Sequence, residues 1–320
     1  MAARGRAAGA PPLKPAVWSN SLMTAADEPS TQQTTSSLTE AIVGYYDETW
    51  LDYRILWLNK DNLAVHFGYT DDSTHGHTDE LKNMNRVLAD RVRIQPGERV
   101  LDAGCGVGGS SLWLATERGA EVVGITLPAR QASMARSHAV ERRLTERVHF
   151  EVADFTATPF PDASFDVVWA LESLCHAPRK AAFYREAARL LRPGGRVVVA
   201  EYVRATRPLD PTGERLLHEW LDGWALPDID TPGEHLEHLA AAGFAEPRLD
   251  DVTTHTRPSL RRLYRMACWT YPLALLGRVT GVRSEVQHGN VIASIRQYQA
   301  LRRDAWFYSI ISATKPAASH

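Results

Sequence analysis

The sequence predicts an α/β protein built on a doubly wound, mostly parallel sheet of seven strands. Short apolar runs such as "RVLDAG", "EVVGIT", "FDVVWAL" and "RVVVAEY" alternate with longer helical segments from about residue 98 onward. Strands that are apolar throughout are typical of a sheet covered on both faces, and regular alternation with helices implies parallel strands. The glycine-rich stretch "GCGVGG" follows the first of these runs, as expected for a tight turn from strand to helix.

A polar segment of low complexity, residues 1–36, precedes the predicted fold, and we expect it to be a disordered leader. Its first two dozen residues contain Arg and Lys but no acid, which also permits a transit peptide. A disordered leader, or a start at Met23, is the simpler interpretation.

Residues 37–94 are expected to form a helical lid. "SLTE" has the form of a capping box between Ser37 and Glu40. Tyr46 and Trp50 then recur at helical spacing in a stretch crowded with aromatic side chains. Such an apolar stripe either packs into a core or closes over a ligand, and the sequence leaves both interpretations open.

The predicted core covers residues 95–253, and a helix after "WALESLCHA" is expected to start at Pro178. This helix should end before "RPGG", where Gly194 can take the left-handed conformation. Further on, "EHLEHLAAAGF" predicts a helix and "PRLDDVT" a short strand. Residues 254–305 are too long for a plain connection, so we expect a helical insertion that caps the substrate, before a final strand and tail at 306–320.

Composition argues for a small-molecule partner. The chain has 36 basic and 38 acidic residues, which excludes a general attraction to nucleic acid. Cys105, Cys175 and Cys268 lie far apart, without zinc-site or disulfide spacing, as expected in a reducing cytoplasm. No apolar stretch approaches the roughly 20 residues of a membrane span. The oligomeric state, a homo-oligomer included, stays open.

The glycine loop is compatible with two classes of ligand. Gly104, Gly106 and Gly109 satisfy the G-x-G-x-x-G pattern, which occurs in both dinucleotide and S-adenosylmethionine sites. Asp102, at the end of the preceding strand, suits a cationic ammonium better than a pyrophosphate. The next strand ends in Thr126, where dinucleotide enzymes usually place a ribose-binding acid. Both details favour S-adenosylmethionine.

Together with "VADF" and "LRPGG", the stretch "LDAGCGVGG" resembles the class I S-adenosylmethionine-dependent methyltransferases between about residues 95 and 205. The resemblance implies a Rossmann-like core with S-adenosylmethionine as methyl donor. It also implies that the methionine moiety contacts Gly104, Gly106 and Gly108, and that adenine contacts Asp154 and Phe155. The family's usual ribose carboxylate is absent, and Thr126 and Gln131 stand in its place, as in the cyclopropane synthase branch.

The stretch "ALESLCHAP" narrows the resemblance to sterol C-24 methyltransferases, and the core is also similar to tocopherol and bacterial terpenoid methyltransferases. "AVHFGY", at 64–69, is similar to a segment ahead of the core in these groups. Glu172 and His176 follow the fourth strand, where ligands of such sheets lie, and they stand four residues apart. We therefore expect both to face the acceptor.

Methylation of an alkene carbon requires shielding of a carbocation and removal of a proton. Aromatic faces can stabilise the cation, and a carboxylate such as Glu172 can accept the proton. The resemblance therefore implies an isoprenoid acceptor and C-methylation, and these residue types suit that chemistry. The candidate substrate-facing residues are Tyr45, Tyr46, Trp50, His66, Trp220 and Trp224.

Several alternatives remain at this stage. Methylation of a phenol, quinol or other natural-product hydroxyl would use His176 as general base, and both residues could be purely structural. A nicotinamide oxidoreductase or a silent binding module would use the same fold. A diphosphate acceptor would also need cations and Mg²⁺. For that acceptor, candidate side chains occur in "HFGYTDDSTHGH" and "RPSLRRLYR", but no metal ligand is assigned.

Overall fold

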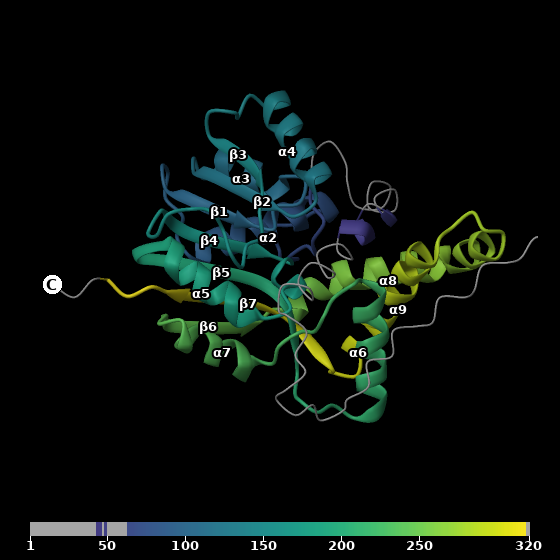
Figure 1. Ribbon diagram of the computed structural model, residues 1–320. Helices are drawn as coiled ribbons and strands as arrows, with labels where there is room; N and C mark the ends of the chain where they lie inside the picture. Colours follow the sequence, from purple (N-terminus) through teal and green to yellow (C-terminus); the bar gives the residue numbers. More distant parts are fainter. Residues whose placement is uncertain (1–42, 47, 50–62, 318–320) are drawn as a thin grey trace, which may run out of the picture. The chain divides into compact units, whose positions relative to one another are not determined.

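The computed structural model of the 320-residue chain describes residues 43–46, 48–49 and 63–317 (Figure 1). The strands are β1 (Arg99–Ala103), β2 (Glu121–Thr126), β3 (Val148–Val152), β4 (Phe165–Leu171), β5 (Leu191–Arg204), β6 (Ala245–Asp251) and β7 (Trp306–Thr314). The helices are α2 (His77–Arg91), α3 (Gly109–Glu117), α4 (Ala129–Glu141), α5 (Lys180–Leu190), α6 (Pro211–Gly223), α7 (Pro232–Ala241), α8 (Thr253–Val279) and α9 (Glu285–Leu301), with a 3-10 turn at Leu174–His176.

All seven strands form one sheet in the order β3-β2-β1-β4-β5-β7-β6. Pairings among β1 to β5 are parallel, and β7 is antiparallel to both β5 and β6. The predicted doubly wound, mostly parallel seven-stranded sheet is confirmed. The strand order reverses between β1 and β4, and the carboxyl ends of these two strands therefore flank the expected ligand crevice.

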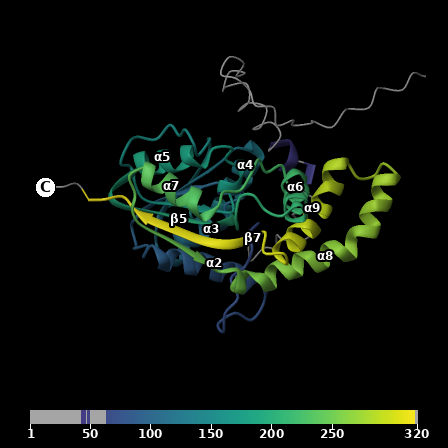
Figure 2. The same ribbon diagram turned by 90° about the horizontal axis from the view of Figure 1, so that it is seen from below.

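Helices cover both faces of the sheet, and the strand residues alternate between two apolar cores. Along β5, Val198 and Ala200 join the core with α2, α3, α6 and α9, whereas Val197 and Val199 join the core with α5 and α7. Figure 2 shows α5 and α7 on one side of the sheet and α2 on the other. Burial on both faces explains why these strands read as continuous apolar runs.

One boundary of α5 is as predicted and one differs, since the helix ends at Leu190, before "RPGG". The helix begins at Lys180 rather than Pro178, and Gly194 does not terminate it. Gly194 has the predicted positive φ of 80°, but it lies inside β5, where its N–H donates to the carbonyl of Lys315 at 2.9 Å. The motif "LRPGG" is therefore the first part of β5. It contains an irregularity of the bulge type, since the pairing of β4 with β5 shifts register between Phe165 and Val167.

Two long helices, α8 and α9, occupy the segment for which the sequence predicts a helical insertion. Figure 2 shows them side by side, with their connecting turn at the end away from the sheet. Ser284 starts α9 through a capping box with Gln287. Of the predicted N-terminal helix, residues 43–46 and 48–49 are helical, while Ser37, Glu40 and Trp50 lie outside the described residues. In the described part of the chain, no helix is both long and apolar enough to traverse a bilayer.

Candidate active site

The glycine loop lies at the switch in strand order, between the carboxyl end of β1 and the start of α3. Gly104 has φ 92°, and a Cβ there would lie 2.2 Å from the Cβ of Ser173, so no other residue fits without displacing the loop after β4. Gly106 has φ 54° and faces open space within 4 Å. The loop thus leaves room for a ligand at Gly106 and holds the β1 and β4 loops together at Gly104.

Asp102 supplies a buried carboxylate next to this loop. Its side chain is 2% exposed and accepts a hydrogen bond from the Ser111 hydroxyl at 2.5 Å. Burial raises the pKa of Asp102 to about 6, against the lowering effect of the Ser111 hydrogen bonds. At this pKa the carboxylate is mostly ionised near pH 7 and can pair with a cationic ligand, which is the property expected of an ammonium-binding acid.

These residues border a cavity of about 100 Å³, here called the glycine-loop pocket. Besides Asp102, Gly104 and Gly106, the predicted residues on its wall are Thr126, Gln131 and Phe155. Thr126 Oγ1 donates to Gln131 Oε1 at 2.8 Å, so the pair forms one polar group on the wall.

Gly108 and Asp154 are not among the residues that line the glycine-loop pocket. A Cβ on Gly108 would lie 2.7 Å from the Phe150 ring, so this glycine is required by helix–sheet packing. Asp154 accepts from the hydroxyl of Thr156 at 2.7 Å, in the loop after β3. Their predicted contacts with methionine and adenine stay predictions.

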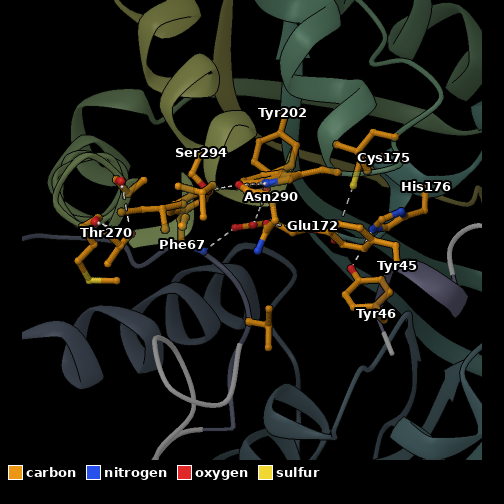
Figure 3. Close-up of a pocket in the computed structure, with 18 of the residues that line it drawn as sticks. Tyr45, Tyr46, Phe67, Glu172, Cys175, His176, Tyr202, Thr270, Asn290 and Ser294 are labelled. Carbon is orange, nitrogen blue, oxygen red and sulfur yellow. Dashed lines mark hydrogen bonds between the residues drawn. The ribbon is translucent and has the colours of Figure 1, made fainter. Parts of the chain in front are cut away.

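A second cavity of about 310 Å³, the aromatic pocket, adjoins the first (Figure 3). Its wall is mostly apolar. It comes from described residues in the ranges 45–46 and 65–67, from the loop after β4, from β5, from the segment after α6, and from α8 and α9. Tyr46, Val65, Glu172 and His176 line both pockets. An acceptor in the aromatic pocket would therefore meet a ligand of the glycine-loop pocket at these four side chains.

Glu172 lies at this boundary and is held by three donors. Its Oε1 accepts from the Phe67 amide at 2.6 Å and from the Tyr308 hydroxyl at 2.7 Å, and its Oε2 accepts from the Tyr202 hydroxyl. Tyr202 on β5 and Tyr308 on β7 are paired in register, which brings both hydroxyls to one carboxylate. Burial nevertheless raises the pKa of Glu172 to about 8.

His176 lies in the 3-10 turn, where its Nε2 and the Tyr46 hydroxyl form a hydrogen bond of 2.9 Å (Figure 3). Its Nδ1 is buried and has no hydrogen-bond partner among the described residues. Burial lowers the pKa of His176 to about 4, with a smaller contribution from Lys180. The imidazole is therefore neutral near pH 7 and can act as a base. His176 and Glu172 line the same two pockets, and their predicted roles toward an acceptor stay predictions.

The segment from Leu63 to Phe67 separates the two pockets. Ala64 and His66 line the glycine-loop pocket, whereas Phe67 lines the aromatic pocket. His66 was predicted to face the substrate, but it lines the glycine-loop pocket instead of the aromatic pocket. Its Nδ1 contacts the Phe67 carbonyl at 3.0 Å, and burial lowers its pKa to about 4.

The predicted aromatic residues divide into two groups. Tyr45, Tyr46 and Trp224 line the aromatic pocket. Trp220 does not line it, because its fully buried ring packs between Tyr202 and Trp306 at centroid distances of 5.2 and 4.8 Å. Trp50 lies outside the described residues.

Sequence reasoning missed the partners of Glu172 and a second buried acid. Glu201, on the opposite face of β5, accepts from the Cys175 amide at 2.8 Å, and burial raises its pKa to about 7. The buried Lys180 ammonium donates to the Ala177 carbonyl at 2.9 Å and is electrostatically coupled to Glu201. An acid within the apolar run "RVVVAEY" was the available signal, since buried acids need specific partners.

No metal-binding group of three or more His, Cys, Asp or Glu side chains occurs among the described residues. The donor set of the glycine-loop pocket instead fits S-adenosylmethionine. A buried carboxylate is available for an ammonium, a polar Thr–Gln pair for hydroxyls and an aromatic ring for a base, around a glycine that leaves open space.

Comparisons with known proteins agree with this assignment. A methyltransferase-domain family model matches residues 101–199. The chain is 37% identical over 197 residues to 27-O-demethylrifamycin SV methyltransferase of Amycolatopsis mediterranei, covering 61% of this chain and 71% of the relative. It is 31% identical to a probable tocopherol O-methyltransferase of Oryza sativa, over 69% of this chain and 64% of the relative. It is 36% identical to 24-methylenesterol C-methyltransferase 2 of Oryza sativa, over 52% and 47%.

Among solved structures, the chain is similar to the [4+2]-cyclase SpnF, with a TM-score of 0.72, 27% identity, and coverage of 88% of this chain and 97% of that one. The fold and the relatives define a methyltransferase built on a seven-stranded sheet. The chain belongs to the class I S-adenosylmethionine-dependent methyltransferases, and the resemblance predicted from its motifs is confirmed.

Proposed function

We propose that this methyltransferase transfers the methyl group to an alkene carbon of an isoprenoid or related terpenoid. The observation that carries this proposal is a buried carboxylate among aromatic rings, at the boundary between the two pockets. Glu172 accepts hydrogen bonds from the hydroxyls of Tyr202 and Tyr308, whose ring centroids are 5.8 Å apart. Phe67 lies 6.2 and 6.4 Å from these two rings.

The aromatic rings suit the charge that this reaction creates. When an alkene carbon takes the methyl group, the neighbouring carbon becomes a carbocation. The faces of aromatic rings stabilise a cation by roughly 0.5 to 2 kcal/mol each. Phe67, Tyr202 and Trp224 all line the aromatic pocket, together with mostly apolar side chains that exclude water. Holding the alkene in line with the donor contributes more, about 7 to 11 kcal/mol.

Glu172 is proposed to complete the reaction by accepting the proton that the carbocation loses, so that a new double bond forms. With a pKa of about 8, Glu172 is mostly protonated at neutral pH in the ligand-free protein. S-adenosylmethionine, when bound, supplies the transferable methyl and a positive sulfonium. A positive charge at this boundary favours the ionised carboxylate, because opposite charges within a few ångströms lower the pKa of an acid.

The charge on the pocket wall supports an uncharged acceptor. Arg283 is the one arginine or lysine among the described residues that line the aromatic pocket. A diphosphate would require more positive charge or Mg²⁺. The proposal is therefore a hydrocarbon or weakly polar terpenoid rather than a prenyl diphosphate.

A second candidate is O-methylation of a natural-product hydroxyl. His176 favours it, because its neutral imidazole lines both pockets, and a neutral imidazole can take a proton from an acceptor hydroxyl. Two of the relatives above have names that refer to O-methylation.

An assay with methyl-labelled S-adenosylmethionine separates these candidates. Acyclic and cyclic terpenes without hydroxyl groups are compared with quinols, phenols and hydroxylated macrocycles, and products are characterised by mass spectrometry and NMR. Labelled C–CH₃ products from the hydroxyl-free terpenes support the proposal. O-methylation is supported instead if the labelled products are ethers only. In that case Glu172→Gln should still form the ethers and His176→Asn should not. Products of unchanged mass would contradict both and indicate an isomerising or cyclising enzyme.

A further inference from the structure

The end of α8 carries an apolar stripe that the rest of the described protein leaves exposed. Trp269, Leu273, Leu276 and Val279 follow at spacings of four, three and three residues, which places them along one side of the helix. Trp269 is 82% exposed and Val279 is 78% exposed. Val282, in the turn after the helix, is 80% exposed. Large apolar side chains that gather in this way on an exposed protein surface indicate an interaction site.

The segment that carries this stripe contains basic but no acidic side chains. Six arginines and no acidic residue occur between Val252 and Ser284. Arg265 stands one turn before Trp269, on the same side of the helix, and is exposed. Arg278 is paired with Glu285 at 2.8 Å. A positively charged surface with a central apolar stripe is complementary to an anionic lipid surface. In a symmetric contact with a second copy, the same arginines would face one another and repel.

The stripe is continuous with the aromatic pocket. Leu273 is 71% exposed and also lines that pocket, as do Thr270 and Ala274 on the same helix. Leu273 therefore joins the exposed stripe to the pocket wall, in the half of α8 that leads to the turn seen at the far end of the α8–α9 pair in Figure 2. A molecule dissolved in a lipid layer under this stripe could enter the pocket without crossing water.

We propose that the C-terminal end of α8 and the turn to α9 bind the surface of an anionic lipid membrane. Trp269, Leu276, Val279 and Val282 insert at the level of the headgroups, and Arg265 contacts lipid phosphates. The apolar acceptor then enters the aromatic pocket directly from the lipid. This last step rests on the proposed function, whereas binding to the lipid surface does not.

Vesicle flotation with the full chain tests this proposal without any turnover measurement. The protein is mixed with vesicles of phosphatidylcholine alone or of phosphatidylcholine with phosphatidylglycerol. NaCl is set at about 0.1 M and 1 M, where charges are screened beyond roughly 10 Å and 3 Å. We expect flotation with the anionic vesicles at low salt and much less with neutral vesicles or at high salt.

Variants locate the surface. Val279→Glu with Val282→Glu should weaken flotation at least about tenfold, because each valine loses its favourable transfer from water and a carboxylate repels the lipid. Arg265→Gln should weaken binding about fivefold, and to anionic vesicles only. The matched control is Val140→Glu on α4, where an equally apolar side chain is 65% exposed far along the chain from α8. This control should float like the wild type.

Three results would overturn the proposal. The first is a wild-type protein that stays at the bottom of the gradient with anionic vesicles. The second is flotation that Val140→Glu weakens as much as the double variant. The third is a dimer, seen by sedimentation without lipid, that the double variant dissociates while the wild type does not float. In that last case the stripe is an interface between two copies of the chain.

Discussion

Replacing Glu172 by Gln is expected to reduce turnover about 10²- to 10⁴-fold, the usual contribution of a positioned general base. The amide keeps the shape of the carboxylate. Its oxygen can still accept from the Phe67 amide and the Tyr308 hydroxyl, and its NH₂ can donate to the Tyr202 oxygen. The variant should therefore keep its fold and its affinity for S-adenosylhomocysteine while losing a proton acceptor. The loss corresponds to roughly 3 to 5 kcal/mol in activation free energy.

The same substitution should change how stability depends on pH. Burial raises the pKa of Glu172 from 4.5 to about 8, so the unfolded chain releases this proton at a lower pH than the folded protein. The contribution is fully present below pH 4.5 and is lost as pH rises to about 8. The difference of about 3.5 pH units corresponds to an upper limit of roughly 5 kcal/mol. Urea unfolding of Glu172→Gln should therefore show a smaller loss of stability between pH 6 and 8.

Single-turnover rates with labelled donor, together with calorimetric binding of S-adenosylhomocysteine, measure the catalytic effect. Glu201→Gln is the matched control, because it removes a second fully buried carboxylate with a raised pKa on the opposite face of β5. Turnover of Glu172→Gln within threefold of the wild type would refute the base role. An equal loss in both variants would mean that the effect is structural.

Three further predictions follow from the two pockets. Asp102→Asn should weaken binding of S-adenosylmethionine by about 1.5 to 3 kcal/mol, and in the wild type calorimetry should show affinity falling as the pH drops below about 6, because Asp102 then gains a proton. Gly104→Ala should lower the melting temperature strongly, because the added Cβ would lie 2.2 Å from Ser173. Gly106→Ala should mainly weaken cofactor binding, because the space beside Gly106 is open. Equal melting temperatures of the two variants would contradict this difference. The pKa of His176 is about 4, so His176 should not change its protonation between pH 8 and 5. With saturating donor and acceptor, the pH profiles of turnover of the wild type and of His176→Asn should therefore have the same shape over this range.

The sequence predicts the parts of the site that a short motif carries. Asp102 and Gly104 follow one strand, Glu172 and His176 follow another, and the carboxyl ends of these strands meet wherever the sheet is doubly wound. Tyr308, in contrast, reaches Glu172 across 136 residues through the pairing of β5 with β7. The pairing register decides which side chains face the site, and a shift of one residue would turn Tyr308 away.

The same reason explains the outcome for Trp220. Its position outside the strands suggested contact with substrate, but α6 turns its ring toward Tyr202 and Trp306. Which side of a helix faces a cavity depends on neighbours that sequence spacing does not reveal. His66 was assigned to the right region but lines the glycine-loop pocket and not the aromatic pocket, which its neighbour Phe67 lines.

The segment from Leu63 to Phe67 borders both the glycine-loop pocket and the aromatic pocket. Ala64 and His66 border one, while the Phe67 ring borders the other and its amide donates to Glu172. A ligand in either pocket that fixes this segment also fixes part of the wall of the other pocket. Binding of the donor should therefore raise the affinity for the acceptor, and binding of the acceptor should raise the affinity for the donor by the same factor. Such reciprocity would slow wasteful hydrolysis of the donor in the absence of an acceptor and favour departure of both products once one has left.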